Sequence, residues 1–498
     1  MNTTHLLILQ VVLPLLSAPF CILIRKQNLV WPLVLIVSWV SFYIACRLLQ
    51  QVLLHEHISY FLGGWAAPWG IEYRLDILNA FVLIIVASVG AIVMTFARDS
   101  ILKEISEDRI YLFYTAYLLN LTGLFGVIVT GDVFNLFVFI EISSLSSYAL
   151  ISLGTHRRSL LAAYRYLVLG TIGATFILIG VGFLYVITGT LNISDLKIRL
   201  QDMESARTVI TALAFLTVGI SIKFALFPLH AWLPNAYTYA PSVVSAFLAS
   251  TTTKVFIYVL LRFLFSIFGA EFVFDVISID KIFLVSALLA IFSGSIAAIY
   301  QTNIKRMLAY SSIAQIGYMI FGISLVSVTG LLGGIIHLFN HALMKAALFL
   351  CMACVYYRLE DTSIESFKGL GKKMPWTMAA FVVGGLSLIG IPLTVGFISK
   401  WYLVQAALEQ DAWWLALAVL AGSLLAVVYI WRVVEVAYFQ QQETPGAVGG
   451  NHRNIKEVPL SMLVPLWTLI IANFYFGINP ELTTGLARQA ANYLLGIN

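Results

Sequence analysis

The feature that most constrains this sequence is a series of long apolar segments separated by short polar stretches. A membrane-spanning helix needs about 20 mostly apolar residues, and segments of this kind recur along almost the whole chain. Charged residues make up only 11% of the 498 residues and hydrophobic residues make up 60%, whereas a soluble domain carries roughly 25% charged residues. So few charges could not cover a soluble protein of this length. The sequence therefore predicts a polytopic membrane protein and excludes a cytosolic enzyme, a nucleic-acid binder and a disordered scaffold.

The apolar segments predict one all-α membrane domain over residues 1–498. Their continuity is typical of helices, because the strands of a membrane β-barrel alternate with a period of two. No polar break is long enough to be a soluble domain, and the residues after Pro480 are expected to form a short surface helix. We expect about 14 transmembrane helices, at residues 5–24, 29–50, 76–97, 109–130, 132–153, 161–188, 208–229, 243–266, 281–300, 305–327, 330–356, 376–406, 412–438 and 459–477.

The distribution of Lys and Arg predicts the orientation of these spans. Loops after odd-numbered spans hold about twice as many Lys and Arg residues as loops after even-numbered spans, and cytoplasmic loops carry the excess of these residues. The N-terminal segment lacks a basic start and a small-residue cleavage site, so we interpret it as a span and not as a removed signal peptide. We therefore expect a multi-pass protein of the cell membrane, embedded in its lipid bilayer, with both termini outside.

The sequence carries no signature of a cofactor. The net charge is only +5 and basic runs are absent, which argues against a nucleic-acid partner. Cys351 and Cys354 form a CxxC pair, but no second pair or other ligand set accompanies it, so we interpret these residues as buried parts of a membrane helix. Glycine-rich phosphate loops and haem or ferredoxin spacings are also missing. The sequence predicts no bound cofactor and no metal.

Two predicted spans are interrupted by proline, and each holds a lysine near the interruption. Pro228 lies at the end of the seventh span, close to Lys223, and Pro392 lies within the twelfth, close to Lys400. Paired broken helices in corresponding halves of a chain indicate a transporter built from inverted repeats. We expect two inverted five-helix repeats, 109–266 (spans 4–8) and 281–438 (spans 9–13), each with a broken helix. The alternative is two ordinary proline kinks.

Several charged residues lie deep inside predicted spans. A charge at the centre of a membrane helix costs about 2.5 to 3.5 kcal/mol on insertion scales, so it is a functional candidate. Glu141, Lys223, Lys254 and Lys400 are all too central to reach the membrane surface easily. A structural ion pair would explain the presence of Glu141 and one lysine. It would not explain the other two lysines, because the set contains only one glutamate.

A further set of titratable residues lies in the eleventh span. His337, His341 and Lys345 follow one another at intervals of four and therefore share one helix face. Histidine gains and loses a proton near physiological pH, which suits the connecting steps of a proton path. For His341 and Lys345, contacts between neighbouring helices remain an equal alternative.

Proton transfer is the chemistry that these residues suit. Burial favours the neutral amine of a lysine, whereas a nearby carboxylate favours the charged ammonium. A Glu141–Lys223 pair that opens and closes would therefore move the lysine between holding and releasing a proton. Ser and Thr residues before Lys254 could bind bridging waters, and a broken helix provides backbone polar groups for a hydrated path.

At these residues the sequence resembles a known family. It is similar to the antiporter-like subunits shared by Mrp-type Na⁺/H⁺ antiporters, respiratory complex I and membrane-bound hydrogenases. The motifs that carry the resemblance are Phe-Ile-Glu141-Ile-Ser-Ser-Leu-Ser-Ser-Tyr, Lys223-Phe-Ala-Leu-Phe-Pro-Leu-His230-Ala-Trp-Leu-Pro-Asn-Ala-Tyr, Ala-Ser-Thr-Thr-Thr-Lys254, Asn-Ile-Lys-Arg-Met-Leu-Ala-Tyr-Ser-Ser-Ile-Ala-Gln-Ile-Gly-Tyr318, His337-Leu-Phe-Asn-His341-Ala-Leu-Met-Lys345-Ala and Gly-Ile-Pro392-Leu-Thr-Val-Gly-Phe-Ile-Ser-Lys400. They extend from the fourth span to the thirteenth.

The resemblance implies a role for each matched residue. Glu141 and Lys223 would form the charge pair of a first half-channel, and Lys254 would be a central lysine connected through His337 to Lys400 on the exit side. His230, His341 and Lys345 are secondary candidates.

The resemblance also implies a function and partners. A lysine at position 400 makes the chain more similar to the D-type subunit of Mrp antiporters, or to the smallest of the complex I antiporter-like subunits, than to the larger relatives. The length of the chain also fits the D-type subunit. We therefore expect a non-enzymatic, proton-translocating subunit of a Na⁺/H⁺ antiporter, bound to other membrane subunits and coupled only indirectly to Na⁺. The alternatives are an antiporter-like subunit of a redox-driven pump, NADH-quinone oxidoreductase or membrane-bound hydrogenase, and a purely structural membrane subunit with buried salt bridges.

Overall fold

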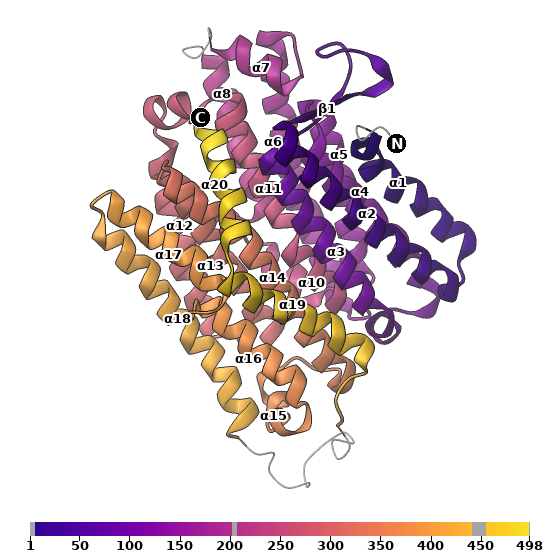
Figure 1. Ribbon diagram of the computed structural model, residues 1–498. Helices are drawn as coiled ribbons and strands as arrows, with labels where there is room; N and C mark the ends of the chain where they lie inside the picture. The colour runs from indigo at the N-terminus through magenta and orange to yellow at the C-terminus, as the bar shows by residue number, and fades with distance from the viewer. Residues whose placement is uncertain (1–4, 202–206, 441–454, 498) are drawn as a thin grey trace.

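The structure is a computed structural model that describes residues 5–201, 207–440 and 455–497. Within these residues the chain forms 20 α-helices and one β-hairpin (Figure 1). The helices are α1 (His5–Ile24), α2 (Gln27–His55), α3 (Ile77–Glu104), α4 (Ile110–Val129), α5 (Val133–Ser152), α6 (Arg157–Thr188), α7 (Ile193–Leu200), α8 (Arg207–Phe224), α9 (Leu233–Tyr239), α10 (Ser242–Ser250), α11 (Thr252–Leu261), α12 (Ile279–Ile299), α13 (Ile304–Ser324), α14 (Val328–Leu359), α15 (Leu370–Lys373), α16 (Pro375–Ile389), α17 (Val395–Glu409), α18 (Trp413–Tyr438), α19 (Leu460–Ile478) and α20 (Glu481–Leu495). The hairpin strands are β1 (Ile58–Phe61) and β2 (Glu72–Leu75), which run antiparallel with Ile58 opposite Leu75.

The helices confirm the prediction of an all-α polytopic membrane protein. In the described part of the chain, 13 helical segments are long and apolar enough to cross a membrane. The predicted twelfth span is absent from that number because it consists of two helices of 15 residues each, α16 and α17. The residues after Pro480 form α20, which lies with one face against α14 and α3.

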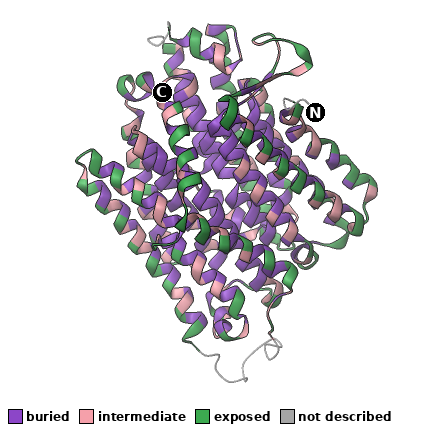
Figure 2. Ribbon diagram, in the orientation of Figure 1, coloured by how far each residue is buried: buried purple, intermediate pink, exposed green. Residues whose placement is uncertain are grey.

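The interior of the bundle is separated from its surroundings by an outer layer of helices. In the segment α10–α11 and in helix α14, every residue of the most apolar 18-residue stretch is buried. In α1, α2, α6, α12 and α18, only 39% of the residues in the corresponding stretch are buried. Figure 2 shows this arrangement as a buried centre with exposed residues toward the periphery. Polar residues on the central helices are therefore surrounded by protein and not by lipid, which is where charges in membrane proteins are found.

The seventh span ends earlier than predicted. Helix α8 stops at Phe224 and not near residue 229, and the next residue, Ala225, takes a positive φ of 62°. Pro228 shortly afterwards has no N–H to donate and disfavours a helical residue before it. The indole of Trp232 donates to the carbonyl of Ile222 at 2.9 Å and so satisfies one of the acceptors that the break leaves free.

The twelfth span is interrupted where the proline predicts it, between α16 and α17. Gly390 ends α16 with φ of 93°, a left-handed conformation that glycine adopts without strain. An added Cβ at this glycine would lie 2.9 Å from Cδ of Lys400, so the position also has to be small.

The eighth span, predicted at 243–266, lies at Ser242–Ile267, but its helix is not regular throughout. It is divided at Thr251 into α10 and α11, and it ends in a π-helical turn over Arg262–Ile267. The break at Thr251 contains no proline or glycine, so no local signal in the sequence indicates it. The two strands of the hairpin were likewise not predicted.

A buried ion pair connects the hairpin region to the end of the eighth span. Asp76 begins α3, where its carboxylate accepts the backbone N–H groups of Leu78 and Asn79, and its Oδ1 lies 2.5 Å from the guanidinium of Arg262. Burial alone would raise the pKa of Asp76, but the charge of Arg262 and these hydrogen bonds hold it below its usual value. The pair joins two segments that are 186 residues apart in sequence.

Replacing Asp76 by asparagine is expected to destabilise the fold, because it leaves the Arg262 guanidinium buried without its counter-charge. Loss of one partner of a buried pair costs about 3 to 5 kcal/mol. Thermal unfolding of the purified protein in detergent would measure this effect. The double variant Asp76→Asn/Arg262→Met removes both charges and should recover part of the loss, and equal destabilisation of the single and double variants would contradict this explanation.

Candidate functional site

Glu141 and Lys223 form a partly buried ion pair between α5 and α8. Lys223 lies in the last turn of α8 and is fully buried, and its Nζ is 3.3 Å from Oε1 of Glu141. The same Nζ donates to the hydroxyl of Ser144 at 2.9 Å. Ser144 lies one turn after Glu141 on the same face of α5. The side chain of Glu141 is 25% exposed, so the pair connects the outside of the bundle with its interior.

Lys254 lies in the first turn of α11, directly after the unpredicted break. It is fully buried and donates to the carbonyl of Ala249, in the last turn of α10, and to the hydroxyl of Thr253 at 3.2 Å. Two further hydroxyls beside the break, those of Ser250 and Thr252, are buried without a hydrogen-bond partner among the described residues. Such hydroxyls are suitable partners for buried water.

Three titratable residues of α14 continue from this region through the centre of the bundle. Lys345 donates to the carbonyl of Leu308 at 2.8 Å and to the hydroxyl of Ser311. The ring of His341 is stacked parallel to that of His337, with centroids 6.0 Å apart. Neither ring nitrogen of His341 has a hydrogen-bond partner in the described part of the chain. Lys345 follows His341 by four residues and so lies one turn further along the same face of α14.

His337 connects α14 to α13 and α17. Its Nδ1 lies 2.7 Å from the hydroxyl of Ser399 and its Nε2 lies 2.9 Å from Oε1 of Gln315. Ser399 directly precedes Lys400, so the histidines of α14 meet the second broken helix at this point. The ring can carry the proton on either nitrogen, which is what a connecting group in a proton path requires.

Lys400 lies in α17, and its side chain reaches back to the C-terminal end of α16. Its Nζ donates to the carbonyls of Leu388 and Ile389 at 3.0 and 2.8 Å and to the hydroxyl of Ser423 at 2.9 Å. The ammonium also lies 4.9 Å from the centre of the ring of Tyr318, a distance at which a cation is attracted to the ring face.

The three lysines share one structural setting. Lys223 belongs to the last turn of α8, Lys254 contacts the last turn of α10, and Lys400 contacts the last residues of α16. The last four carbonyls of a helix have no partner within it, and together they place a partial negative charge at its C-terminus. The breaks after α10 and α16 therefore each provide carbonyl acceptors for a lysine ammonium, those of Lys254 and Lys400. The ammonium of Lys223 instead contacts Glu141 and Ser144.

The structure does not bring all predicted residues together. His230 lies on the non-helical segment after α8 and stacks on the ring of Phe227 with centroids 5.1 Å apart. Within the described residues, no hydrogen bond or ion pair joins it to Glu141 or Lys223. Over residues 5–201, 207–440 and 455–497, no three His, Cys, Asp or Glu side chains are placed so that they could hold a metal ion.

Sequence reasoning missed the neutral partners of the charged residues. Ser144, Gln315, Ser399 and Ser423 each make a hydrogen bond to a lysine or histidine of this site. Gln315 is a polar amide in an apolar helix and could have been noticed. The serines could not, because serine is common in membrane helices and its hydroxyl can bond to the carbonyl of the preceding turn.

Comparison with known proteins identifies what the chain is similar to. Residues 130–426 match the family described as NADH:quinone oxidoreductase/Mrp antiporter, TM. The N-type subunit of NADH-quinone oxidoreductase from Desulforudis audaxviator is 40% identical over 99% of this chain and 100% of its own length. The D-type subunit of the Na(+)/H(+) antiporter from Alkalihalophilus pseudofirmus is 31% identical over 99% of this chain and 97% of its own. A subunit of the membrane-bound sulfane sulfur reductase, an archaeal respiratory membrane complex, is 30% identical with a TM-score of 0.90, and the match covers 98% of this chain and 97% of that one.

Proposed function

This chain belongs to the NADH:quinone oxidoreductase/Mrp antiporter family, and we propose that it is a proton-translocating subunit of a multi-subunit membrane complex. The observation that carries the proposal is the partly buried Glu141–Lys223 pair, together with the fully buried Lys254 and the protonatable side chains of α14 and α17 that lie between it and Lys400. Buried ion pairs are poor contributors to stability, so a bundle that needed only stability would not require this arrangement.

In the proposed path, each of these side chains holds the proton or passes it on. When Glu141 lies beside Lys223, its negative charge favours the ammonium, and when the two separate, burial favours release of the proton. Lys254 receives the proton from within the bundle and passes it through His341 and His337, both on one face of α14. Ser399 contacts His337 and adjoins Lys400, which holds the proton at the carbonyl end of α16 until it leaves the protein. Waters bridge the gaps between these side chains.

The proposal includes the repeats and the orientation. Residues 109–266 and 281–438 would be the inverted repeats, and support comes from the breaks, because α8 and α16–α17 each belong to the fourth span of their repeat. We place the basic loops in the cytoplasm and both termini outside the cell membrane, following the excess of Lys and Arg.

For the complex as a whole, we propose a Na⁺/H⁺ antiporter in which Na⁺ is exported elsewhere in the complex or at an interface. Support comes from the likeness to the D-type subunit of the Na(+)/H(+) antiporter over almost the whole of both chains. The second candidate is a redox-driven pump, which the higher identity of 40% to the N-type oxidoreductase subunit favours. Both candidates use the same path through this chain and differ in what drives it.

Transport by the reconstituted complex separates the two candidates. Vesicles that contain the complex and an internal pH-sensitive dye are given a Na⁺ gradient without any electron donor. The antiporter predicts proton movement in response to the Na⁺ gradient alone. Proton movement that occurs only after addition of NADH and a quinone would overturn the antiporter and support the redox-driven pump.

A further inference from the structure

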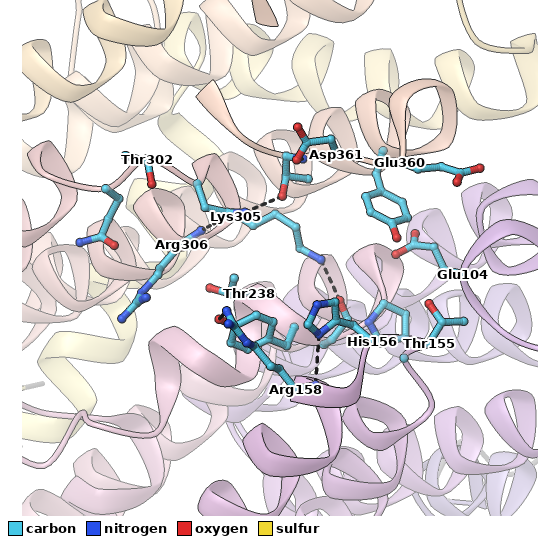
Figure 3. A pocket seen from close by; sticks show the side chains of 18 residues that line it. Glu104, Thr155, His156, Arg158, Thr238, Thr302, Lys305, Arg306, Glu360 and Asp361 are labelled. Carbon is cyan, nitrogen blue, oxygen red and sulfur yellow. Dashed lines mark hydrogen bonds between the residues drawn. The ribbon is translucent and has the colours of Figure 1, made fainter. Parts of the chain in front are cut away.

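A cavity of about 410 Å³ opens at one end of the bundle, away from the residues of the proposed path. Its walls come from the ends of α3 and α14, the segments before α6 and α10, and the segment between α12 and α13. These segments belong to the end of the protein that carries most of the basic loops. Figure 3 shows that the cavity is lined by charged and polar side chains, among them Glu104, Lys305, His156 and Arg158.

Glu104 and Lys305 face each other in the wall of this cavity across Ser242. The two carboxylate oxygens of Glu104 accept three hydrogen bonds, from the backbone N–H of Ser242 at 2.7 Å, from its hydroxyl at 3.0 Å and from the hydroxyl of Ser100 at 3.0 Å. Nζ of Lys305 donates to the carbonyl of Ala240 at 2.7 Å and to the hydroxyl of Ser242 at 3.4 Å. Both charged side chains are more than 90% buried, and neither has a part in the path proposed above.

Ser242 is the first residue of α10, the helix whose other end contacts Lys254. Every residue of α10 is buried. Residues three and four apart share a helix face, so Ser242, Ser245 and Ala249 follow one another toward Lys254, which contacts the carbonyl of Ala249. At 1.5 Å per residue, α10 covers roughly 12 Å between Ser242 and Ser250. The unpartnered hydroxyls of Ser250 and Thr252 lie at the far end of this distance.

From this arrangement we propose that the cavity is the aqueous access through which protons reach Lys254, and that Glu104 is the carboxylate that accepts them. This inference rests on the proposed function and adds a route to it. It adds an aqueous access to Lys254, while the Glu141–Lys223 pair stays necessary for flux.

The transfer involves only O–H and N–H bonds. A hydronium ion in the cavity gives its proton to the carboxylate of Glu104, which becomes a neutral carboxyl group and leaves water behind. The carboxyl group passes the proton to the hydroxyl of Ser242, which releases its own proton to the next hydroxyl or water along α10. At the end of the relay the neutral amine of Lys254 becomes an ammonium, and Glu104 is again a carboxylate facing Lys305.

The first test replaces Glu104 by glutamine, which keeps the shape and one acceptor but cannot be ionised. Proton flux in the reconstituted complex should fall by about 100-fold or more, the range that a positioned proton-transfer group contributes. The matched control is Glu107→Gln, since Glu107 is an exposed carboxylate three residues further on that does not line the cavity. Parental flux in Glu104→Gln, in a preparation where Glu141→Gln is inactive, would overturn the access route and leave the proposed function standing. Parental flux in Glu141→Gln would instead overturn the proposed function.

A second test does not depend on how Glu104→Gln folds. Thr155 is exposed at the cavity, so the thiol of Thr155→Cys should react with a charged, membrane-impermeant methanethiosulfonate reagent and block the access. We expect loss of flux when the reagent is applied from the cytoplasmic side. Ser106→Cys, exposed outside the cavity, and the parent protein should keep their flux. Unchanged flux in fully modified Thr155→Cys, or equal loss in Ser106→Cys, would overturn the proposal.

Discussion

Replacing Lys223 by alanine is expected to abolish proton flux through the reconstituted complex while the complex still assembles. The variant removes the ammonium that contacts Glu141 and Ser144 and therefore the group that holds the proton between the partly exposed carboxylate and the interior. Glu141→Ala should have the same effect. Glu141→Asp keeps the charge but shortens its reach, so it should keep partial activity. The measurement is dye-reported proton flux together with the amount of assembled complex in the membrane.

A surface ion pair provides the matched control for this experiment. Lys103 and Glu360 lie 3.5 Å apart with side chains 47% and 68% exposed, and exposed pairs contribute little to stability. Lys103→Ala should therefore transport like the parent. Normal transport in both Lys223→Ala and Glu141→Ala would contradict the proposed path. Failed assembly of both would instead favour the structural alternative, in which the pair only holds α5 and α8 together.

Replacing Lys254 is expected to have an equally large effect, and two substitutions separate its charge from its proton. Lys254→Ala removes the ammonium that contacts the α10–α11 break and should stop transfer to the histidines of α14. Lys254→Arg restores a positive charge that stays protonated in proteins. If Lys254 has to release a proton, both variants should be inactive.

The Lys254→Ala and Lys254→Arg variants together distinguish a role in proton transfer from a role as a fixed positive charge. A charge needed only to satisfy the carbonyl of Ala249 would be supplied by arginine as well, so an active Lys254→Arg variant would contradict a role in proton transfer. Parental flux in Lys254→Ala would show that the central role assigned to this lysine is wrong. Flux and assembly are measured as for Lys223, so that a loss of activity is not mistaken for a loss of the complex.

The scarcity of charge in the sequence made the fold class and most candidate residues predictable. Apolar segments of sufficient length have to become helices in a membrane, because every backbone polar group needs a partner there. Against that background, Glu141, Lys223, Lys254, His337 and Lys400 stood out in the sequence. Pro228 and Pro392 indicated two of the breaks, although α8 ends some five residues earlier than expected.

Neighbours that are distant in sequence were not predictable in the same way. The third break, at Thr251, has no proline or glycine that would indicate it in the sequence. Ser144 and Ser399 became partners of the charged residues only because α5 meets α8 and α14 meets α17. Glu104 lies between the predicted spans 76–97 and 109–130, whereas in the structure α3 continues to this residue and buries it. Nothing in the local sequence indicates this continuation.

The sequence by itself thus determined that the chain spans a membrane many times and which few charges it carries at depth, because both follow from the cost of placing polar groups in lipid. Only the tertiary structure decided what those charges contact. It placed lysines at the carbonyl ends of interrupted helices, and it brought Glu104 and Lys305, 201 positions apart, to opposite sides of Ser242. The physical reason is that an insertion cost belongs to one residue and its segment, whereas a hydrogen bond or an ion pair requires two groups to meet, and helix packing decides which groups those are.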